Sequence, residues 1–208
     1  MEEFDNYKYE KELREDGIKF IAGVDEVGRG PLVGPVVAAC VVLPDEFNLD
    51  GLTDSKKLSE KKRDYYFDEI NRIALGVGVG LIDEKKIDEV NIYEATKLAM
   101  RAAIEDCKKM CEIEHVLIDA MPLELDVPTT SIIKGDLKSI TISAASVIAK
   151  VTRDRMLDEL HEKYPMYDFK KNKGYPTKKH LEAILEYGII DEHRRSYGPV
   201  KNYLEKSE

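Results

Sequence analysis

The chain has 208 residues, of which 43% are hydrophobic and 35% are charged, and its formal net charge is −9. This length fits one domain with a small appendage, and the hydrophobic fraction is too high for a disordered chain. The longest apolar run, residues 32–43, contains a proline and is far shorter than the roughly 20 residues that a membrane helix needs. Acidic residues at positions 2, 3 and 5 argue against a leader peptide, so we expect no membrane association.

The hydrophobic pattern of the first half alternates strands with helices. It predicts, in chain order, a strand at 20–24, a strand at 33–43, a helix from the N-cap Ser59 to residue 73, a strand at 74–82 and a helix from Asn91 to about Cys111. The strand at 74–82 alternates glycine with valine, which is typical of a strand packed closely by its neighbours. Asn91 with Glu94 resembles a capping box.

The second half begins with strands and ends in helices. It predicts, in chain order, strands at 116–118 and 130–133, a long helix opened by Ser143, and a last helix capped by Thr177 and ended by Gly188. This order predicts an α/β fold in which helices cover a sheet. We predict a catalytic domain over residues 1–166 and a helical C-terminal extension, packed on it, over residues 167–208.

Three cysteines, Cys40, Cys107 and Cys111, form no CxxC pair. This is typical of reduced thiols in an intracellular protein, and we expect a cytoplasmic location. Cys107, Cys111 and His115 follow one another at helical spacing and could form a soft metal site. Tetrahedral zinc needs a fourth ligand, however, and nothing nearby supplies one. We therefore favour cysteines on a half-buried helix face.

Four acidic residues come at the ends of predicted strands. Asp25 and Glu26 directly follow the first strand, and Asp119 and Asp136 follow two later ones. Adjacent side chains of a strand point to opposite faces, but at a frayed end both acids can turn toward one site. Mg²⁺ prefers carboxylate oxygens, and two such ions suit attack on a phosphodiester. Acids after strands are also common turn residues, so both interpretations stay open.

The segment Gly28-Arg29-Gly30 follows the first two acids. Glycines let a backbone approach a ligand closely and expose N–H groups to phosphate or sugar oxygens, although a plain turn between strands is the alternative. Residues 23–28 have the GxxxxG spacing of a P-loop, but Arg29-Gly30 stands where Lys and Ser or Thr are required, which excludes the usual ATPase. The glycines of 76–80 lack the GxGxxG spacing of a Rossmann cofactor site.

The C-terminal third is basic, since residues 134–206 contain 15 Lys and Arg against 11 Asp and Glu. Within it, residues 170–180 hold five lysines, Tyr175 and no acid. Lysines bind phosphates, and an exposed ring can stack on a sugar or base. Composition alone favours a basic surface loop without a ligand. Residues 54–57, Asp-Ser-Lys-Lys, could add phosphate contacts or simply form a helix entry.

Together these segments resemble the type 2 ribonucleases H, in particular the bacterial ribonuclease HII family. The resembling segments are Gly23–Val37, Asp54–Ser59, Ser143–Arg155, Gly174–Thr177 and His193–Val200. The resemblance covers about residues 20 to 200. Its first segment is highly specific, because the sister ribonuclease HIII group typically carries Gly-Lys-Gly where this chain has Gly28-Arg29-Gly30.

The resemblance implies an RNase H-like mixed sheet flanked by helices, a Mg²⁺ or Mn²⁺ requirement, and an endonuclease that hydrolyses the RNA strand of RNA/DNA hybrids. It also implies cleavage at single ribonucleotides embedded in duplex DNA, as in ribonucleotide excision, by a two-metal-ion mechanism. The family's four metal-binding acids match Asp25, Glu26, Asp119 and Asp136. Its loop that senses the ribose 2′-OH matches Gly28, Arg29 and Gly30, and its tyrosine that stacks on a deoxyribose matches Tyr175.

Two departures from the family pattern concern the loops beside these acids. Asp119 is followed by Ala120-Met121 where Gly-Asn is common, and Asp136 is followed by Leu137 where Ser is common. Both departures leave the acids in place but raise the question of how the adjoining loops are held.

Two other classes of function stay open from the sequence. A junction resolvase of the same fold would use similar acids without needing a ribonucleotide, and a non-catalytic protein would bind nucleic acid without cutting it. We expect the partners to be RNA/DNA hybrids and ribonucleotide-containing DNA, and the chain to be a monomer. Asp154 is interpreted as a buried structural acid with a basic partner such as Arg153 or Arg155.

Overall fold

The computed structural model describes residues 6–207, so the acidic positions 2, 3 and 5 lie outside the described residues. Its five strands are β1 (Ile21–Val27), β2 (Val36–Val42), β3 (Gly76–Ile82), β4 (His115–Asp119) and β5 (Thr129–Ile132). They form one sheet in the order β3-β2-β1-β4-β5. β2 runs antiparallel to β1 and β3, whereas β1, β4 and β5 are parallel. The predicted mixed sheet is confirmed.

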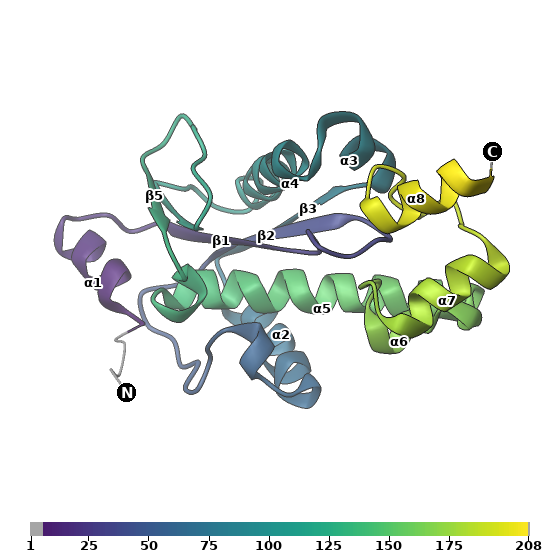
Figure 1. Ribbon diagram of the computed structural model, residues 1–208. Helices are drawn as coiled ribbons and strands as arrows, with labels where there is room; N and C mark the ends of the chain where they lie inside the picture. The colour runs from purple at the N-terminus through teal and green to yellow at the C-terminus, as the bar shows by residue number, and fades with distance from the viewer. Residues whose placement is uncertain (1–5, 208) are drawn as a thin grey trace.

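Helices cover both faces of the sheet and continue beyond one end of it (Figure 1). They are α1 (Lys8–Glu15), α2 (Glu60–Ile73), α3 (Glu84–Val90), α4 (Ile92–Cys107), α5 (Ile140–Lys163), α6 (Phe169–Asn172), α7 (Lys178–Tyr187) and α8 (Gly198–Ser207). α3 and α4 lie on one face, and α5 lies on the other with α2 packed beside it (Figure 1). The sequence pattern did not predict α1, α3, α6 or α8 as individual helices. In the described part of the chain, no helix is long and apolar enough to cross a membrane.

The inner strand β2, between β3 and β1, is buried along its whole length because both of its faces are covered. Ala38 and Cys40 contribute to the core beneath α4, while Val37 and Val41 contribute to the core beneath α5. Alternate side chains of a strand point to opposite faces, so one apolar run serves two cores. Complete burial of a valine contributes about 1.5–3 kcal/mol. This explains why the run at 33–43 reads as continuous rather than alternating.

The glycines of β3 bring α4 unusually close to the sheet. A Cβ atom added to Gly78 would lie 2.1 Å from the carbonyl oxygen of Ala103, and one added to Gly80 would lie 2.0 Å from that of Ala99. Any larger residue would force the helix backbone away from the strand. The predicted close packing of this strand is therefore confirmed.

Helix boundaries agree with the predicted caps at three sites and disagree at one. Ser59, Asn91 and Thr177 each accept a hydrogen bond from the first turn of their helices. The prediction that Ser143 opens the long helix was wrong. α5 begins at Ile140 with Ser139 as its N-cap, and the Ser143 hydroxyl instead donates to carbonyl oxygens within and before the first turn.

The C-terminal helices pack against the end of α5 and share a core with the loop after β1 (Figure 1). Leu32 and Val33 of that loop pack with Leu157 of α5 and with Phe169 and Ile184 of the extension. The helical extension is thus confirmed as an element of the fold. The division between residues 166 and 167 stays a prediction.

Candidate active site

Asp25 and Glu26 lie inside β1 rather than after it, which corrects their predicted position. The strand continues past them because it pairs with β2, with Asp25 opposite Ala39. Asp25 is 6% exposed, and its Oδ1 accepts a hydrogen bond from the backbone N–H of Glu26 at 2.7 Å. Strand alternation sends the Glu26 side chain to the other face, but its carboxylate still interacts with the charge of Asp119.

Asp119 and Asp136 reach the same region from the parallel half of the sheet. Asp119 is the last residue of β4, the neighbour of β1, and Asp136 lies in a short 3-10 turn, Gly135–Leu137, after β5. The backbone N–H of Gly135 donates to Asp119 Oδ1 at 2.6 Å. This bond ties the turn that carries Asp136 to the side chain of Asp119.

The departure after Asp119 has a visible structural consequence. Ala120 adopts a left-handed backbone conformation with φ of 48°. This region disfavours residues with a Cβ by about 1–2 kcal/mol, and glycine avoids that penalty. The N–H of Ala120 donates to the carbonyl of Ile132 at 3.0 Å, so pairing with the next strand holds the loop in place.

The four acids form an electrostatically coupled cluster. Burial raises the pKa of Asp25 well above its ordinary value, and the charges of Glu26 and Asp119 raise it further. Burial is also the largest cause of the raised pKa values of Glu26, Asp119 and Asp136. Carboxylates that repel one another in a partly buried site favour a cation beside them. Hard divalent cations prefer such oxygen donors, so this donor set fits Mg²⁺ or Mn²⁺.

The four carboxylates are not arranged as a complete coordination site for one metal ion. Among residues 6–207, no three His, Cys, Asp or Glu side chains stand where together they could hold one metal ion. The roles of Asp25, Glu26, Asp119 and Asp136 as metal ligands therefore stay a prediction.

Lys56 is a residue of this region that received no individual role from the sequence. It lies in the 3-10 turn Ser55–Lys57, which Asp54 caps. Burial lowers the pKa of Lys56, but Asp25 and other nearby acids outweigh that effect, so its pKa is raised. A hydrogen bond of 2.8 Å between the hydroxyls of Ser55 and Ser146 fixes the turn against α5. The segment at 54–57 thus lies beside the acids, as its possible role in phosphate contact requires.

The segment Gly28-Arg29-Gly30 forms a loop whose carbonyls are held by a buried arginine. Arg194 donates to the carbonyl oxygens of Gly28 at 2.6 Å and Arg29 at 3.0 Å. It also donates to Gly34 at 2.9 Å and 2.8 Å. The Arg29 side chain forms an ion pair of 3.6 Å with Glu26, which joins the loop to the acidic cluster.

Arg153 is a second buried arginine that holds the same region. From α5 it donates to the carbonyls of Pro35, Val33 and Lys173, each at 3.0 Å. A Cβ on Gly28, whose φ is +92°, would lie 2.2 Å from Arg153 Nε. Sequence reasoning named Arg153 only as a possible partner of Asp154 and gave Arg194 no role, and the only signal for their position here was their presence in the resembling segments at 143–155 and 193–200.

Tyr175 lies beside this loop and faces outward. Its side chain is 46% exposed, and a Cβ on Gly30 would lie 3.2 Å from its ring. The N–H of Leu32 donates to the carbonyl of Gly174 at 2.8 Å, which joins the two loops. The three loop residues and Tyr175 are therefore brought together, and their contact with a substrate stays a prediction.

The lysines around Tyr175 are less available than composition suggests. Lys173 pairs with Asp158 at 2.5 Å, and Lys179 pairs with Asp168 at 3.0 Å. Such pairs reduce the positive charge that the segment 170–180 presents to a phosphate backbone.

The structure corrects the predicted partner of Asp154. The partner is Lys150, at 2.6 Å, and not Arg153 or Arg155, because Arg153 is turned inward toward backbone carbonyls. His115 approaches Thr130 at 2.8 Å, and no metal-holding group includes it in the described part of the chain.

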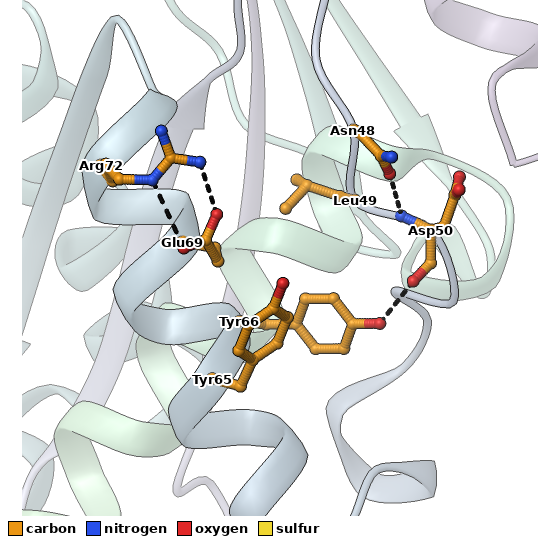
Figure 2. Close-up of a pocket in the computed structure, with 7 residues that line it drawn as sticks. All are labelled: Asn48, Leu49, Asp50, Tyr65, Tyr66, Glu69 and Arg72. Carbon is orange, nitrogen blue, oxygen red and sulfur yellow. Dashed lines mark hydrogen bonds and ion pairs between the residues drawn. The ribbon is translucent and has the colours of Figure 1, made fainter.

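A separate pocket of about 380 Å³ lies between α2 and the loop that precedes it (Figure 2). The Tyr66 hydroxyl donates to the carbonyl of Asp50 at 2.6 Å, and Arg72 pairs with Glu69 at 2.6 Å. None of the predicted site residues lines this pocket. We therefore assign it no part in the candidate active site.

The fold has close counterparts among solved structures. The ribonuclease H2 from Pyrococcus horikoshii OT3 matches with a TM-score of 0.72 and 30% identity, over 89% of this chain and 97% of that chain. Bst-RNase HIII in complex with Mn²⁺ matches with a TM-score of 0.68 over 91% of this chain and 70% of that chain, but its 16% identity shows the fold alone. The class of protein is therefore an RNase H-type nuclease.

Sequence comparison gives the family within that class. The family model for ribonuclease HII matches residues 22–199. A ribonuclease HII from Bacillus cereus (strain B4264) is 58% identical over 203 residues, which are 98% of this chain and 78% of that protein. The chain belongs to the ribonuclease HII family, and it is a metal-dependent endoribonuclease, a hydrolase that acts on RNA/DNA hybrids.

Proposed function

We propose that the protein also cleaves at single ribonucleotides embedded in duplex DNA, and that it does so with two divalent cations held by Asp25, Glu26, Asp119 and Asp136. The observation that carries the proposal is the cluster of these four buried or partly buried carboxylates, whose pKa values are all raised, with burial as the largest cause. The negative charge of this site repels the phosphate backbone of a nucleic acid. Divalent cations bound at the site would neutralise that charge and allow the backbone to approach.

The cation requirement follows from the chemistry of the substrate. When bound, the divalent cations activate the attacking water and stabilise the charge that develops on the phosphate. Asp25 and Asp119, on adjacent strands, and Asp136, on the turn bonded to Asp119, supply the oxygen ligands. The Mn²⁺ named in the Bst-RNase HIII structure supports Mg²⁺ or Mn²⁺ as the ion, since both prefer such ligands.

Recognition of a single ribose requires a rigid group that contacts the 2′-OH. This hydroxyl distinguishes RNA from DNA at one nucleotide and does not depend on the base. The loop at 28–30 suits this role because Arg194 bonds two of its carbonyls from inside the protein and the Arg153 side chain lies against Gly28. The exposed ring of Tyr175, next to Gly30, is placed to stack on the neighbouring sugar.

One assay tests the proposal. A labelled DNA duplex with one ribonucleotide is compared with its all-DNA twin and with an RNA/DNA hybrid, each with and without Mg²⁺. We expect cation-dependent cleavage at the ribonucleotide and none of the all-DNA duplex. Cleavage of the all-DNA twin would favour a resolvase-like enzyme, and cleavage of the hybrid alone would show that the loop does not recognise an isolated ribose.

We further propose that the protein acts as a monomer in the cytoplasm. Its three cysteines are free, which fits a reducing compartment. Sedimentation of the purified chain with and without the ribonucleotide-containing duplex tests the oligomeric state, with one chain per duplex as the expected stoichiometry.

A further inference from the structure

The N-terminal helix α1 contacts the beginning of α5 through one buried carboxylate. Glu10 is only 5% exposed and is the one residue of this eight-residue helix that is buried. Its Oε1 atom accepts hydrogen bonds from the Ser139 hydroxyl at 2.5 Å, from the Thr141 hydroxyl at 2.7 Å and from the Thr141 N–H at 3.0 Å. α1 precedes the region that the family model matches, which starts at residue 22.

Glu10 completes the cap of α5. The first amides of a helix have no partner within it, and a negative charge at this end is favourable. The Ser139 side chain satisfies the N–H of Ile142 at 3.2 Å, and Glu10 satisfies the N–H of Thr141. A side chain from the other end of the sequence therefore fixes where the 24-residue helix begins.

The first turn of α5 is bonded directly to the turn that carries Asp136. The N–H of Ser139 donates to the carbonyl of Gly135 at 2.9 Å. The Ser143 hydroxyl donates to the carbonyls of Asp136 at 2.9 Å and Ser139 at 3.0 Å. A shift of this helical turn therefore moves the backbone of Asp136 with it.

The same helical turn also rests on the strand that carries Asp25. A Cβ on Gly23 would lie 2.1 Å from the carbonyl carbon of Thr141, so the strand and helix backbones are in direct contact. Thr141 is thus held between Gly23 on one side and Glu10 on the other. The first turn of α5 is the joint between Asp25 in β1 and Asp136 after β5.

We propose that Glu10 is a positioning residue that sets the place of Asp136 relative to Asp25 and Asp119, and thereby the affinity of the site for divalent cations. The inference rests on the proposed function, because it requires Asp136 to be a metal ligand. Groups that orient metal ligands without touching the metal typically change metal affinity or activity by 10–100-fold when they are removed.

Removal of the Glu10 carboxylate should leave α1 attached to the protein. Tyr9 and Leu13 of α1 and Ile18 after it pack against Ile21, Leu117, Ile132 and Ile142. Arg14 pairs with Asp45 and donates to the carbonyl of Pro44 at 3.2 Å. Substitution of Glu10 therefore isolates its effect on α5 from a general loss of the helix.

The test compares Glu10→Ala and Glu10→Gln with Glu12→Ala, which removes an exposed glutamate from the same helix. Mn²⁺ binding is measured by electron paramagnetic resonance, and hybrid cleavage is measured across a Mg²⁺ titration. For Glu10→Ala we expect about tenfold weaker Mn²⁺ binding and a matching rise in half-saturating Mg²⁺, with most of the rate restored at saturating Mg²⁺. Glu10→Gln keeps an acceptor oxygen and should lie near wild type, as should Glu12→Ala.

Asp136→Asn, alone and combined with Glu10→Ala, separates the positioning role of Glu10 from the assignment of Asp136 as a metal ligand. If Glu10 acts through Asp136, the double variant binds Mn²⁺ no more weakly than Asp136→Asn alone. Wild-type Mn²⁺ binding by Asp136→Asn overturns the ligand set on which the inference rests. If Asp136→Asn binds Mn²⁺ more weakly but Glu10→Ala binds it as wild type does, only the positioning role of Glu10 is overturned. This conclusion holds whatever the melting temperature of Glu10→Ala.

Discussion

The acidic cluster and the loop beside it both bury charged groups, but they treat those charges in opposite ways. Asp25, Glu26, Asp119 and Asp136 have one another as neighbours, and burial and mutual repulsion raise their pKa values. Arg153 and Arg194 are even more completely buried, yet each donates several hydrogen bonds to backbone carbonyls. Buried polar groups with satisfied hydrogen bonds rigidify a structure, whereas unbalanced buried charge destabilises it.

This difference predicts that substitutions in the acidic cluster change activity, whereas substitutions beneath the loop change stability. A charge removed from the acidic cluster should abolish cleavage without weakening the fold, because that charge is unfavourable until a cation is present. A charge removed from beneath the loop should weaken the fold itself, because backbone carbonyls lose their donors.

The largest effect on activity is expected for Asp25→Asn. The change replaces a charged oxygen ligand by a neutral amide of the same shape, and we expect more than about a thousandfold loss of hybrid cleavage. The melting temperature should stay the same or rise, because repulsion with Glu26 and Asp119 is relieved. Cleavage rates across a Mg²⁺ titration and thermal unfolding measure both effects. Near wild-type activity at ordinary Mg²⁺ would refute the ligand assignment.

The largest effect on stability is expected for Arg194→Met. The carbonyls of Gly28, Arg29 and Gly34 lose a shared donor, and each buried acceptor left unsatisfied costs about 1–3 kcal/mol. We expect destabilisation by about 3 kcal/mol or more, measured by urea unfolding, with loss of ribonucleotide-directed cleavage. Arg195→Met, a change at the exposed neighbouring arginine, is the matched control. Equal unfolding midpoints for the two variants would show that the loop does not depend on Arg194.

These arginines mark the limit of what the sequence could predict. Short-range patterns were sufficient for the five strands and for the caps at Ser59 and Thr177, because apolar alternation and capping act within a few residues. An arginine in a helix or loop usually lies at the surface. The burial of Arg194 is visible only once the carbonyl of Gly34, 160 residues earlier, lies beside it.

The start of α5 was mispredicted for the same reason. The helical spacing of apolar residues after Ser143 predicted a start there, whereas the helix begins at Ile140, directly after Ser139, whose N–H is bonded to the carbonyl of Gly135. Glu10 favours the observed start, because its carboxylate bonds to Ser139 and Thr141 across the fold. The structure brings the candidate acids together because they lie at or near the ends of adjacent parallel strands. Their individual contacts, such as the bond from the Gly135 N–H to Asp119, required the tertiary structure.

A buried pair of histidines, His180 and His193, should make the stability of the fold depend on pH. The N–H of Ile190 donates to His193 Nδ1 at 3.0 Å, so the proton of neutral His193 sits on Nε2 and is donated to His180 Nε2 at 3.1 Å. His180 then donates from Nδ1 to the carbonyl of Tyr175 at 2.9 Å. Both rings are neutral in this chain of bonds, which supports the loop that carries Tyr175.

Acid should therefore weaken the fold. Burial, followed by His180, lowers the pKa of His193 to about 4 from its ordinary 6.5. Because the folded pKa is the lower one, the unfolded chain binds the proton first, and stability is lost as pH falls from about 6.5 to about 4. This shift corresponds to roughly 3 kcal/mol. Urea unfolding between these pH values should show a steeper loss in wild type than in His193→Gln, and parallel curves would contradict the assignment.

A smaller effect is expected for substitution of Tyr175, which lies at the surface beside the loop at 28–30. If its ring stacks on a sugar, Tyr175→Ala loses about 1–3 kcal/mol of substrate interaction, a ten- to hundredfold drop in kcat/KM on the single-ribonucleotide duplex. Tyr175→Phe keeps the ring and should retain most activity, and Tyr187→Ala removes another exposed tyrosine as a control. A destabilised but fully active Tyr175→Ala would instead indicate that the ring only packs beneath α7.

The smallest effect is expected for Asp154→Asn. Asp154 and Lys150 form a partly buried ion pair of 2.6 Å on α5, outside the cluster of Asp25, Glu26, Asp119 and Asp136. Loss of one such pair typically costs about 1 kcal/mol or less. We therefore expect a slightly lower melting temperature and unchanged Mn²⁺ binding and cleavage. Substitution of an acid of the cluster should show the reverse pattern, with cleavage lost and the melting temperature unchanged. If Asp154→Asn shows that pattern, Asp154 rather than Asp136 is the fourth catalytic acid.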